Sequence, residues 1–234
     1  MLALYHKTNI NVHRALRDDL ELSRYVTPDM ESANLWMYGF IPEAYEEIFN
    51  REWLDYIRTL NIYPDAVVVF YKKPNCVNNI HSDGMPADQQ NDGNFYQYGV
   101  NWVVNPGYMN GNGASEQWRN WKDTGVMSWY DVPEHNQFFV DVGSQEEKDI
   151  GNAPVQITPW DKVGYRRVPA NSNYTKVSQL QYDDQAYLVN GEAYHEVVTT
   201  DQPRVSLSLR STIKPEASSW ENVVTTFQQR NLLV

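Results

Sequence analysis

Three residues of this chain have the types and spacing of a metal site. His81 and Asp83 lie two positions apart, and His195 follows far along the sequence. In an extended segment, residues i and i+2 project to the same side, so the first two side chains would point together. Two imidazoles and one carboxylate make up the facial triad that holds iron(II) on three corners and leaves three positions open. The residues therefore predict a metal site whose second histidine comes from another strand of a folded-back sheet.

The segment that follows His195 alternates strictly between polar and apolar side chains. A period of two with β-branched and aliphatic residues predicts a half-buried β-strand. The apolar face must be covered by another layer, and the polar face then borders either water or a polar cavity. The polar residues of this strand are Arg204, Ser206, Ser208 and Arg210, and the apolar ones are Val205, Leu207 and Leu209.

The order of these motifs is a His-x-Asp pair, a long gap, a second His and then Arg-x-Ser. This order resembles that of the iron(II)/2-oxoglutarate-dependent oxygenases. The Tyr-His-Glu-Val segment at 194–197 and the Pro-Arg-Val segment at 203–205 are most similar to the aspartyl/asparaginyl β-hydroxylase-type branch. That branch often lacks a carboxylate ligand in its first motif, whereas Asp83 is present here. The resemblance covers about residues 65–212.

The resemblance implies a role for each motif. His81, Asp83 and His195 would bind iron(II) and form the catalytic centre. Arg204 would pair with the distal carboxylate of the cosubstrate 2-oxoglutarate, and Ser206 would donate a hydrogen bond to it. The implied activity is that of a dioxygenase, a hydroxylase that uses O2 and couples decarboxylation of 2-oxoglutarate to succinate with substrate oxidation. The substrate would be a small molecule or a protein side chain.

Two other functions stay open. A cupin-like metal protein would use the same triad without 2-oxoglutarate, and it would not need the cation that Arg204 supplies. A non-catalytic jelly-roll module would bind a carbohydrate or a partner chain through its aromatic residues, since the chain has 8 Trp and 16 Tyr. Trp118 and Trp121 either line such a cleft or pack under a glycine-rich loop. Arg210 either borders solvent, contacts an acidic neighbour or has no function.

Amphipathic segments at both ends flank a series of short strands. A helix is predicted over about 42–60, and its face is expected to cover the sheet that contains the Arg204 strand. Ser218 and Glu221 form a possible capping box for a second helix over about 218–228, and a further helix start is predicted at Thr27-Pro28-Asp29. Apolar and β-branched runs predict strands at 65–71, 95–104, 137–142, 155–157, 177–180 and 186–189.

These elements predict a mainly β fold, a double-stranded β-helix (jelly roll, cupin-like) with flanking α-helices. The length suits a single domain over 1–234. Within it we expect a helical N-terminal part at about 27–60, a β-core at about 65–212 and the C-terminal helix.

The composition of the chain limits which binding partners and which cellular compartment we expect. The formal net charge of −11 would repel a phosphate backbone, so no nucleic-acid partner is expected. No stretch approaches the roughly 18 apolar residues of a membrane span, so no membrane partner is expected either. The single cysteine, Cys76, excludes an intramolecular disulfide framework. These features favour a cytoplasmic protein, and they leave its oligomeric state open.

Overall fold

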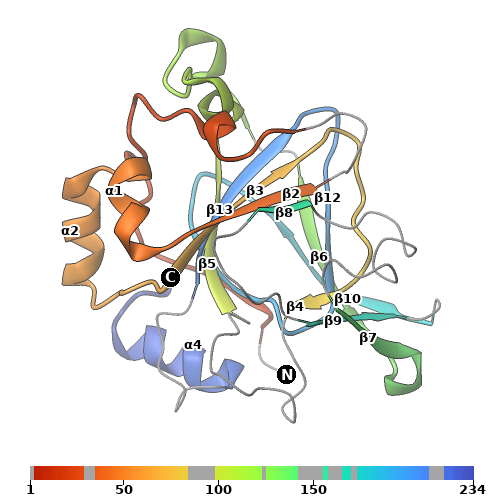
Figure 1. The fold of residues 1–234 in the computed structure, drawn as a ribbon. Helices are drawn as coiled ribbons and strands as arrows, with labels where there is room; N and C mark the ends of the chain where they lie inside the picture. The colour runs from red at the N-terminus through yellow and green to blue at the C-terminus, as the bar shows by residue number, and fades with distance from the viewer. Residues whose placement is uncertain are drawn as a thin grey trace.

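A computed structural model of the chain describes residues 3–28, 35–83, 98–122, 125–141, 155–157, 165–169, 173–210 and 219–234. The fold is mainly β, with antiparallel sheets and a few helices (Figure 1). Among the described residues, no helix is long and apolar enough to cross a membrane.

The largest sheet has seven strands, and β13 lies at its centre between β5 and β3. All neighbouring strands pair antiparallel except β2 and β8, which are parallel. In spatial order the strands are β1 (Tyr5–Lys7), β11 (Tyr187–Asn190), β5 (Tyr98–Val104), β13 (Arg204–Arg210), β3 (Ala66–Lys72), β2 (Leu35–Phe40) and β8 (Val155–Ile157).

Two smaller sheets have three strands each. One contains β10 (Thr175–Gln181), β6 (Val126–Asp131) and β12 (His195–Val198), and the other contains β4 (Ser82–Asp83), β9 (Tyr165–Pro169) and β7 (Gln137–Asp141). Isolated bridges Val77↔Val198 and His81↔His195 place the segment before β4 alongside β12. The two small sheets therefore meet at the two histidines.

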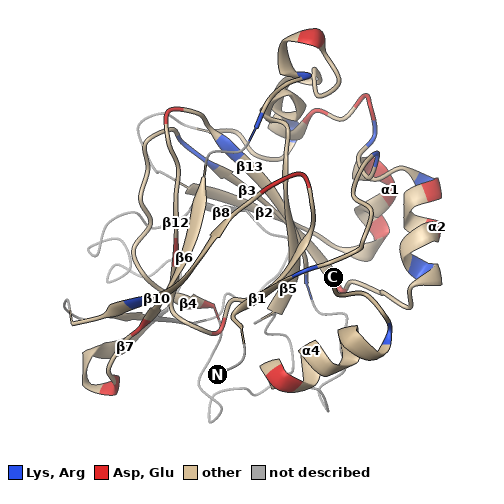
Figure 2. Cartoon of the chain, turned by 180° about the vertical axis from the view of Figure 1, so that it is seen from behind, with Lys and Arg blue, Asp and Glu red and all other residues tan. Residues whose placement is uncertain are grey.

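The helices are short and gather on one side of the large sheet (Figure 1). The α-helices are α1 (Tyr45–Ile48), α2 (Arg51–Thr59) and α4 (Trp220–Gln229). Single 3-10 turns are η1 (Leu22–Arg24), η2 (Pro42–Ala44), η4 (Pro106–Asn110), η5 (Glu116–Trp118) and η6 (Glu134–Asn136). Most charged residues lie on these helices and on connecting segments, whereas the strands are largely uncharged (Figure 2).

The main hydrophobic core lies between the large sheet and the helices. The apolar side chains of β13 belong to the same buried cluster as residues of α2 and α4. The Trp53 ring of α2 lies 5.9 Å from the Trp102 ring of β5, which is opposite Leu207 in the sheet. The prediction that a helix layer covers the apolar face of the Arg204 strand is therefore confirmed.

A second core connects the large sheet to the sheet of β10, β6 and β12. Met127 and Trp129 of β6 and Leu180 of β10 pack with Tyr187 and Val189 of β11. Consequently the polar face of β13, which is opposite its helix-covered face, looks into the space between sheets rather than into bulk water.

The predicted strands at 65–71, 137–142, 155–157, 177–180 and 186–189 correspond to β3, β7, β8, β10 and β11. The predicted strand at 95–104 corresponds to β5, although its first three positions lie outside the described residues. The helix start at 27–29 extends outside them as well, and so does Ser218. Ser219 caps α4 instead, because its side chain accepts a hydrogen bond from the backbone N–H of Asn222.

The single helix expected over 42–60 is wrong. Phe49 has an extended backbone and bridges Leu16, so the chain turns between α1 and α2. The Asn50 side chain donates to the carbonyl oxygens of Arg14 and Leu16, which fixes the break. Nor is the N-terminal part wholly helical, since β2 joins the large sheet within it. Apolar periodicity continues through the break because Phe49 and Trp53 stack at 4.8 Å in one core.

We predict that Leu207→Ala lowers the free energy of unfolding by about 2–5 kcal/mol, because it removes a fully buried side chain from the central strand. Chemical denaturation followed by circular dichroism measures the change. Val177→Ala on β10, where the valine is 44% exposed, is the matched control and should change stability by less than about 0.5 kcal/mol. Equal losses in the two variants would contradict the central position of β13 in the core.

Candidate metal centre

Backbone pairing brings the two histidines together. The His81 N–H donates to the His195 carbonyl oxygen at 2.9 Å, and the His195 N–H donates to the His81 carbonyl oxygen at 2.7 Å. Residues that exchange both bonds lie directly opposite in an antiparallel pair, and their side chains share one face. Asp83, two residues after His81 in extended chain, projects to the same side. The triad therefore follows from strand register rather than from a flexible loop.

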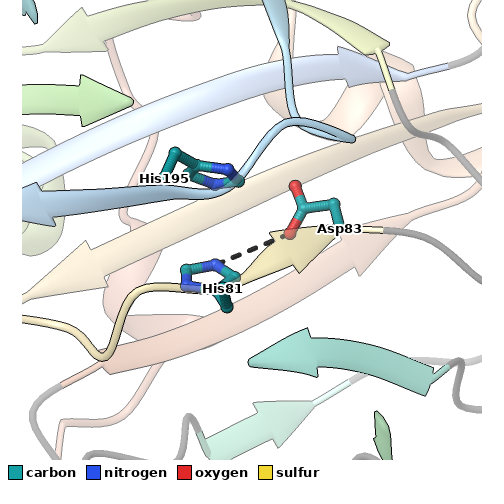
Figure 3. Close-up of side chains that lie close together, drawn as sticks. All are labelled: His81, Asp83 and His195. Carbon is teal, nitrogen blue, oxygen red and sulfur yellow. Dashed lines mark ion pairs between the residues drawn. The ribbon is translucent and has the colours of Figure 1, made fainter. Parts of the chain in front are cut away.

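The three side chains point into one space, as Figure 3 shows. Each offers a ligand atom, and these atoms all lie within 4.8 Å of one another. The imidazole centroids are 4.5 Å apart, and His81 Nε2 lies 3.6 Å from Asp83 Oδ1. His195 is buried, while the Asp83 side chain keeps 29% of its surface exposed. The structure thus brings His81, Asp83 and His195 together as the sequence predicts.

The two imidazoles are held in one tautomer. His81 Nδ1 lies 2.7 Å from the Asn79 carbonyl oxygen, and His195 Nδ1 lies 2.9 Å from the Ala193 carbonyl oxygen. A carbonyl oxygen only accepts, so each Nδ1 carries the proton and donates it. In the neutral imidazole each Nε2 then directs its lone pair toward the shared space, as in metal-binding histidines whose other nitrogen is hydrogen-bonded to a backbone carbonyl.

Arg210 holds the carboxylate of the triad. Its Nη1 and Nη2 both lie 3.3 Å from Asp83 Oδ2, and its side chain is 9% exposed. Asp83 Oδ2 is therefore bound by the guanidinium, while Oδ1 faces His81. Of the three outcomes open for Arg210 in the sequence, the acidic neighbour is the one observed, and that neighbour is a predicted metal ligand.

Gly99 leaves the room that Arg210 needs. Gly99 lies opposite Arg210 in the pairing of β5 with β13. A Cβ at position 99 would lie 2.5 Å from Ser208 Oγ and 3.2 Å from Arg210 Cδ. Because atoms cannot approach so closely, a larger residue there would displace the polar face of β13.

Arg204 lies at the other end of the same face. All seven residues of β13 are buried, and Arg204 Nη1 donates to Ser206 Oγ at 3.3 Å. The guanidinium carbon lies 4.7 Å from the centre of the Tyr182 ring, a cation–π contact. Arg204 and Ser206 are therefore adjacent and share a face as predicted, inside the protein rather than at its surface.

The donor set fits a divalent metal of the iron type. Two imidazoles and one carboxylate occupy one side of the shared space, which is the arrangement of a facial triad with open positions. Arg210 corresponds to the outer hydrogen-bonding partner that orients a ligating carboxylate. His81, Asp83 and His195 would hold the metal, and exogenous ligands could take its remaining positions.

The triad does not include the other described histidines at positions 13 and 135, the cysteine or the two tryptophans after β5. His13 and His135 are exposed. Cys76 is a buried free thiol whose backbone N–H donates to Thr199 Oγ1. Trp118 and Trp121 are half-buried on the segment after β5. Tyr182 contacts the Arg204 guanidinium, and Lys72 lies opposite Arg204 in the neighbouring strand. Neither residue was predicted from the sequence, because neither belongs to a motif.

Comparison with known proteins assigns no family. No protein-family model matches the chain, and no curated protein matches it. Function is therefore inferred from the residues and from their geometry.

We predict that His81→Ala or His195→Ala abolishes retention of iron(II), because each removes one of only two imidazole donors. Asp83→Ala should weaken binding and leave a site with one vacant corner. Elemental analysis after anaerobic loading and desalting measures the metal per chain, with His135→Ala as the exposed control. Equal iron in the wild type and in the double histidine variant would exclude the site.

We predict that Arg210→Gln lowers metal affinity about 10–100-fold, the usual cost of losing a partner that orients a ligand. Isothermal titration with Mn(II) measures the affinity. Arg58→Gln on α2 is the matched control, because the Arg58 side chain is 58% exposed and far from the triad in sequence. Unchanged Mn(II) affinity in Arg210→Gln would mean that the Asp83 carboxylate does not depend on the guanidinium.

Proposed function

We propose that the protein is an iron(II)- and 2-oxoglutarate-dependent dioxygenase that acts as a hydroxylase. One observation carries the proposal: the buried polar face of β13 contacts a potential facial triad through Arg210 and also carries the buried Arg204–Ser206 pair. Arg210, at one end of the polar face of β13, contacts the triad through Asp83. Arg204, at the other end of that face, lies beside Ser206. A molecule with a chelating end and a carboxylate end would suit this arrangement.

The order of strands supports a double-stranded β-helix as the finer description of the fold. The large sheet contains the neighbours β3, β13, β5 and β11. The opposing set contains the segment around His81, then β12, β6 and β10. Along the chain from β3 to β13, the strands of these two sets alternate, except that β6 and β10 both belong to the second set and are separated in the chain by β7, β8 and β9. That alternation is what a jelly roll requires.

The protein's own residues have separable tasks in this proposal. Bound iron(II) would supply the open coordination positions and the redox chemistry that couples decarboxylation of 2-oxoglutarate to oxidation of a substrate. The two Nδ1–H groups keep the imidazoles oriented, and Arg210 keeps the Asp83 carboxylate oriented. Arg204 would neutralise the distal carboxylate, because an unpaired carboxylate in a buried site is costly. A guanidinium can also present two parallel donors to it.

Arg204 separates this proposal from a cupin-like metal protein. A site that needs only the triad gains nothing from a buried cation, yet Arg204 is only 7% exposed and is stacked on Tyr182. Burial of a permanent positive charge is expensive unless it is paired or serves a ligand. The position of this buried guanidinium beside the Ser206 hydroxyl supports a metal site that also binds an anion.

We predict that Arg204→Ala weakens 2-oxoglutarate binding by about 2–5 kcal/mol, as expected when one partner of a desolvated charge pair is removed. Ser206→Ala should weaken 2-oxoglutarate binding less, by about 1–2 kcal/mol, because it removes one charge-assisted hydrogen bond. Arg204→Lys keeps the positive charge but loses the two parallel N–H donors of the guanidinium. It should therefore weaken 2-oxoglutarate binding more than metal binding. Titration of 2-oxoglutarate into anaerobic Mn(II)-loaded protein measures all three.

The control for this series is Arg58→Ala, which removes an exposed arginine of α2. A screen for succinate formation with iron(II), O2 and candidate small molecules or peptides then tests turnover. If Arg204→Ala binds 2-oxoglutarate as tightly as the wild type, the carboxylate anchor lies elsewhere. The cupin-like alternative would then be preferred.

A further inference from the structure

A second cation lies beside Arg204 inside the protein. Lys72, the last residue of β3, is 2% exposed and stands directly opposite Arg204 in the pairing of β3 with β13. Residues in such register project their side chains from the same face of the sheet. Two cationic side chains therefore start from neighbouring positions on the interior face of the large sheet.

The Lys72 side chain spans the space between the sheets. Its ammonium donates a hydrogen bond to the carbonyl oxygen of Val197 in β12, on the opposing sheet. β12 also carries His195, so Lys72 reaches the strand that supplies one triad residue. Its bond to Val197 is to a neutral group, which leaves its charge without full compensation from that contact.

The protonation of Lys72 is finely balanced. Burial, and then the positive charge of Arg204, lower the pKa of the Lys72 ammonium from 10.5 to about 7. Cys76 on the following loop and Glu196 on β12 act in the opposite direction. On the remaining side, the β2 residue opposite Lys72 is the apolar Leu35. In the part of the chain that the structure describes, the charged or titratable groups that act on Lys72 are Arg204, Cys76 and Glu196, and Arg204 is the permanent cation.

We propose that Lys72 and Arg204 form a two-cation subsite for the distal carboxylate of 2-oxoglutarate, and that Lys72 takes up a proton when this carboxylate binds. The inference rests on the proposed function, because it assigns the cosubstrate to the same interior face. A carboxylate between the two cations favours the charged form of the lysine, since an opposite charge offsets both desolvation and the repulsion by Arg204. In this arrangement Arg204 is the constant partner and Lys72 the adjustable one.

The sign of the pH dependence follows. Below the pKa of Lys72 in the free protein, the ammonium is already charged, and the anion binds without proton uptake. Above it, binding must also protonate the lysine, so affinity falls as pH rises until the pKa of the complex is reached. With a free pKa about 7, affinity should fall about tenfold between pH 6 and pH 8. Proton uptake should approach about one per 2-oxoglutarate at pH 8.

Calorimetry measures the uptake directly. Anaerobic Mn(II)-loaded protein is titrated with 2-oxoglutarate at pH 8 in phosphate and in Tris, whose ionisation enthalpies differ, and the difference in heat gives the number of protons bound. Lys72→Met removes the titrating group, so it should bind more weakly at pH 6 and show no proton uptake. Lys72→Arg carries a permanent charge, so its affinity should stay level from pH 6 to pH 8. Lys122→Met, at an exposed position, should match the wild type.

The outcomes separate the two proposals. If wild-type protein binds 2-oxoglutarate without proton uptake and with level affinity from pH 6 to pH 8, the role of Lys72 is overturned while the proposed function stands. If it takes up a proton and Lys72→Met does so equally, another group is responsible and the role of Lys72 is again overturned. If metal-loaded wild-type protein does not bind 2-oxoglutarate at all, both proposals fail. The wild-type measurement alone can decide against Lys72, even if a variant does not fold.

Discussion

The central constraint in this molecule is that β13 is buried on both faces. One face carries aliphatic side chains that join the helix-covered core, and the other carries two arginines and two serines. Permanent charges inside a protein require partners, because desolvation of an unpaired ion costs several kcal/mol. The Asp83 carboxylate meets this requirement for Arg210. The same strand that organises the core therefore also positions the polar groups of the interior.

Strand register fixes the geometry of the site. His81 and His195 are paired through both of their backbone bonds, and Arg204 and Lys72 are paired across β13 and β3. A slip of one residue in either pairing would turn every side chain to the opposite face. It would place aliphatic groups in the polar interior and arginines in the hydrophobic core. The hydrophobic pattern thus protects the geometry of the site, although no site residue belongs to the main core.

Much of this arrangement could be predicted from local sequence. The period of two at 204–210 identified β13 and its two faces, and the His-x-Asp spacing placed two triad side chains on one side. The contact of Arg210 with Asp83 could not be predicted, because strand rise alone separates the backbone positions of Arg204 and Arg210 by roughly 20 Å. Which of the two arginines reaches the triad depends on the course of the segment before β4. That course is set by long-range pairing with β12.

The errors have physical causes as well. Apolar periodicity runs across the break at Phe49 because the ring keeps its place in the core while the backbone turns. Strand β2 was missed because a short mixed segment becomes a strand only when β3 and β8 pair with it. A role for Lys72 in the site could not be predicted from the sequence, because a single lysine at the end of an apolar run is usually solvent-exposed. Only the register with Arg204 makes it informative.

Charge is distributed so that an anion would be recognised at short range. The chain has a formal net charge of −11, and its acidic residues lie mostly on helices and connections (Figure 2). The net negative charge therefore repels a dianion at long range, and salt would screen this repulsion beyond about 10 Å. Between the sheets the local charge differs, because Arg204 and Lys72 are buried opposite each other at one end of β13 and no net acidic cluster surrounds them among the described residues. In a region of low effective dielectric, such cations act far more strongly than exposed ones. Specific binding of an anion would then depend on these buried cations, and charged residues on the surface could not substitute for them.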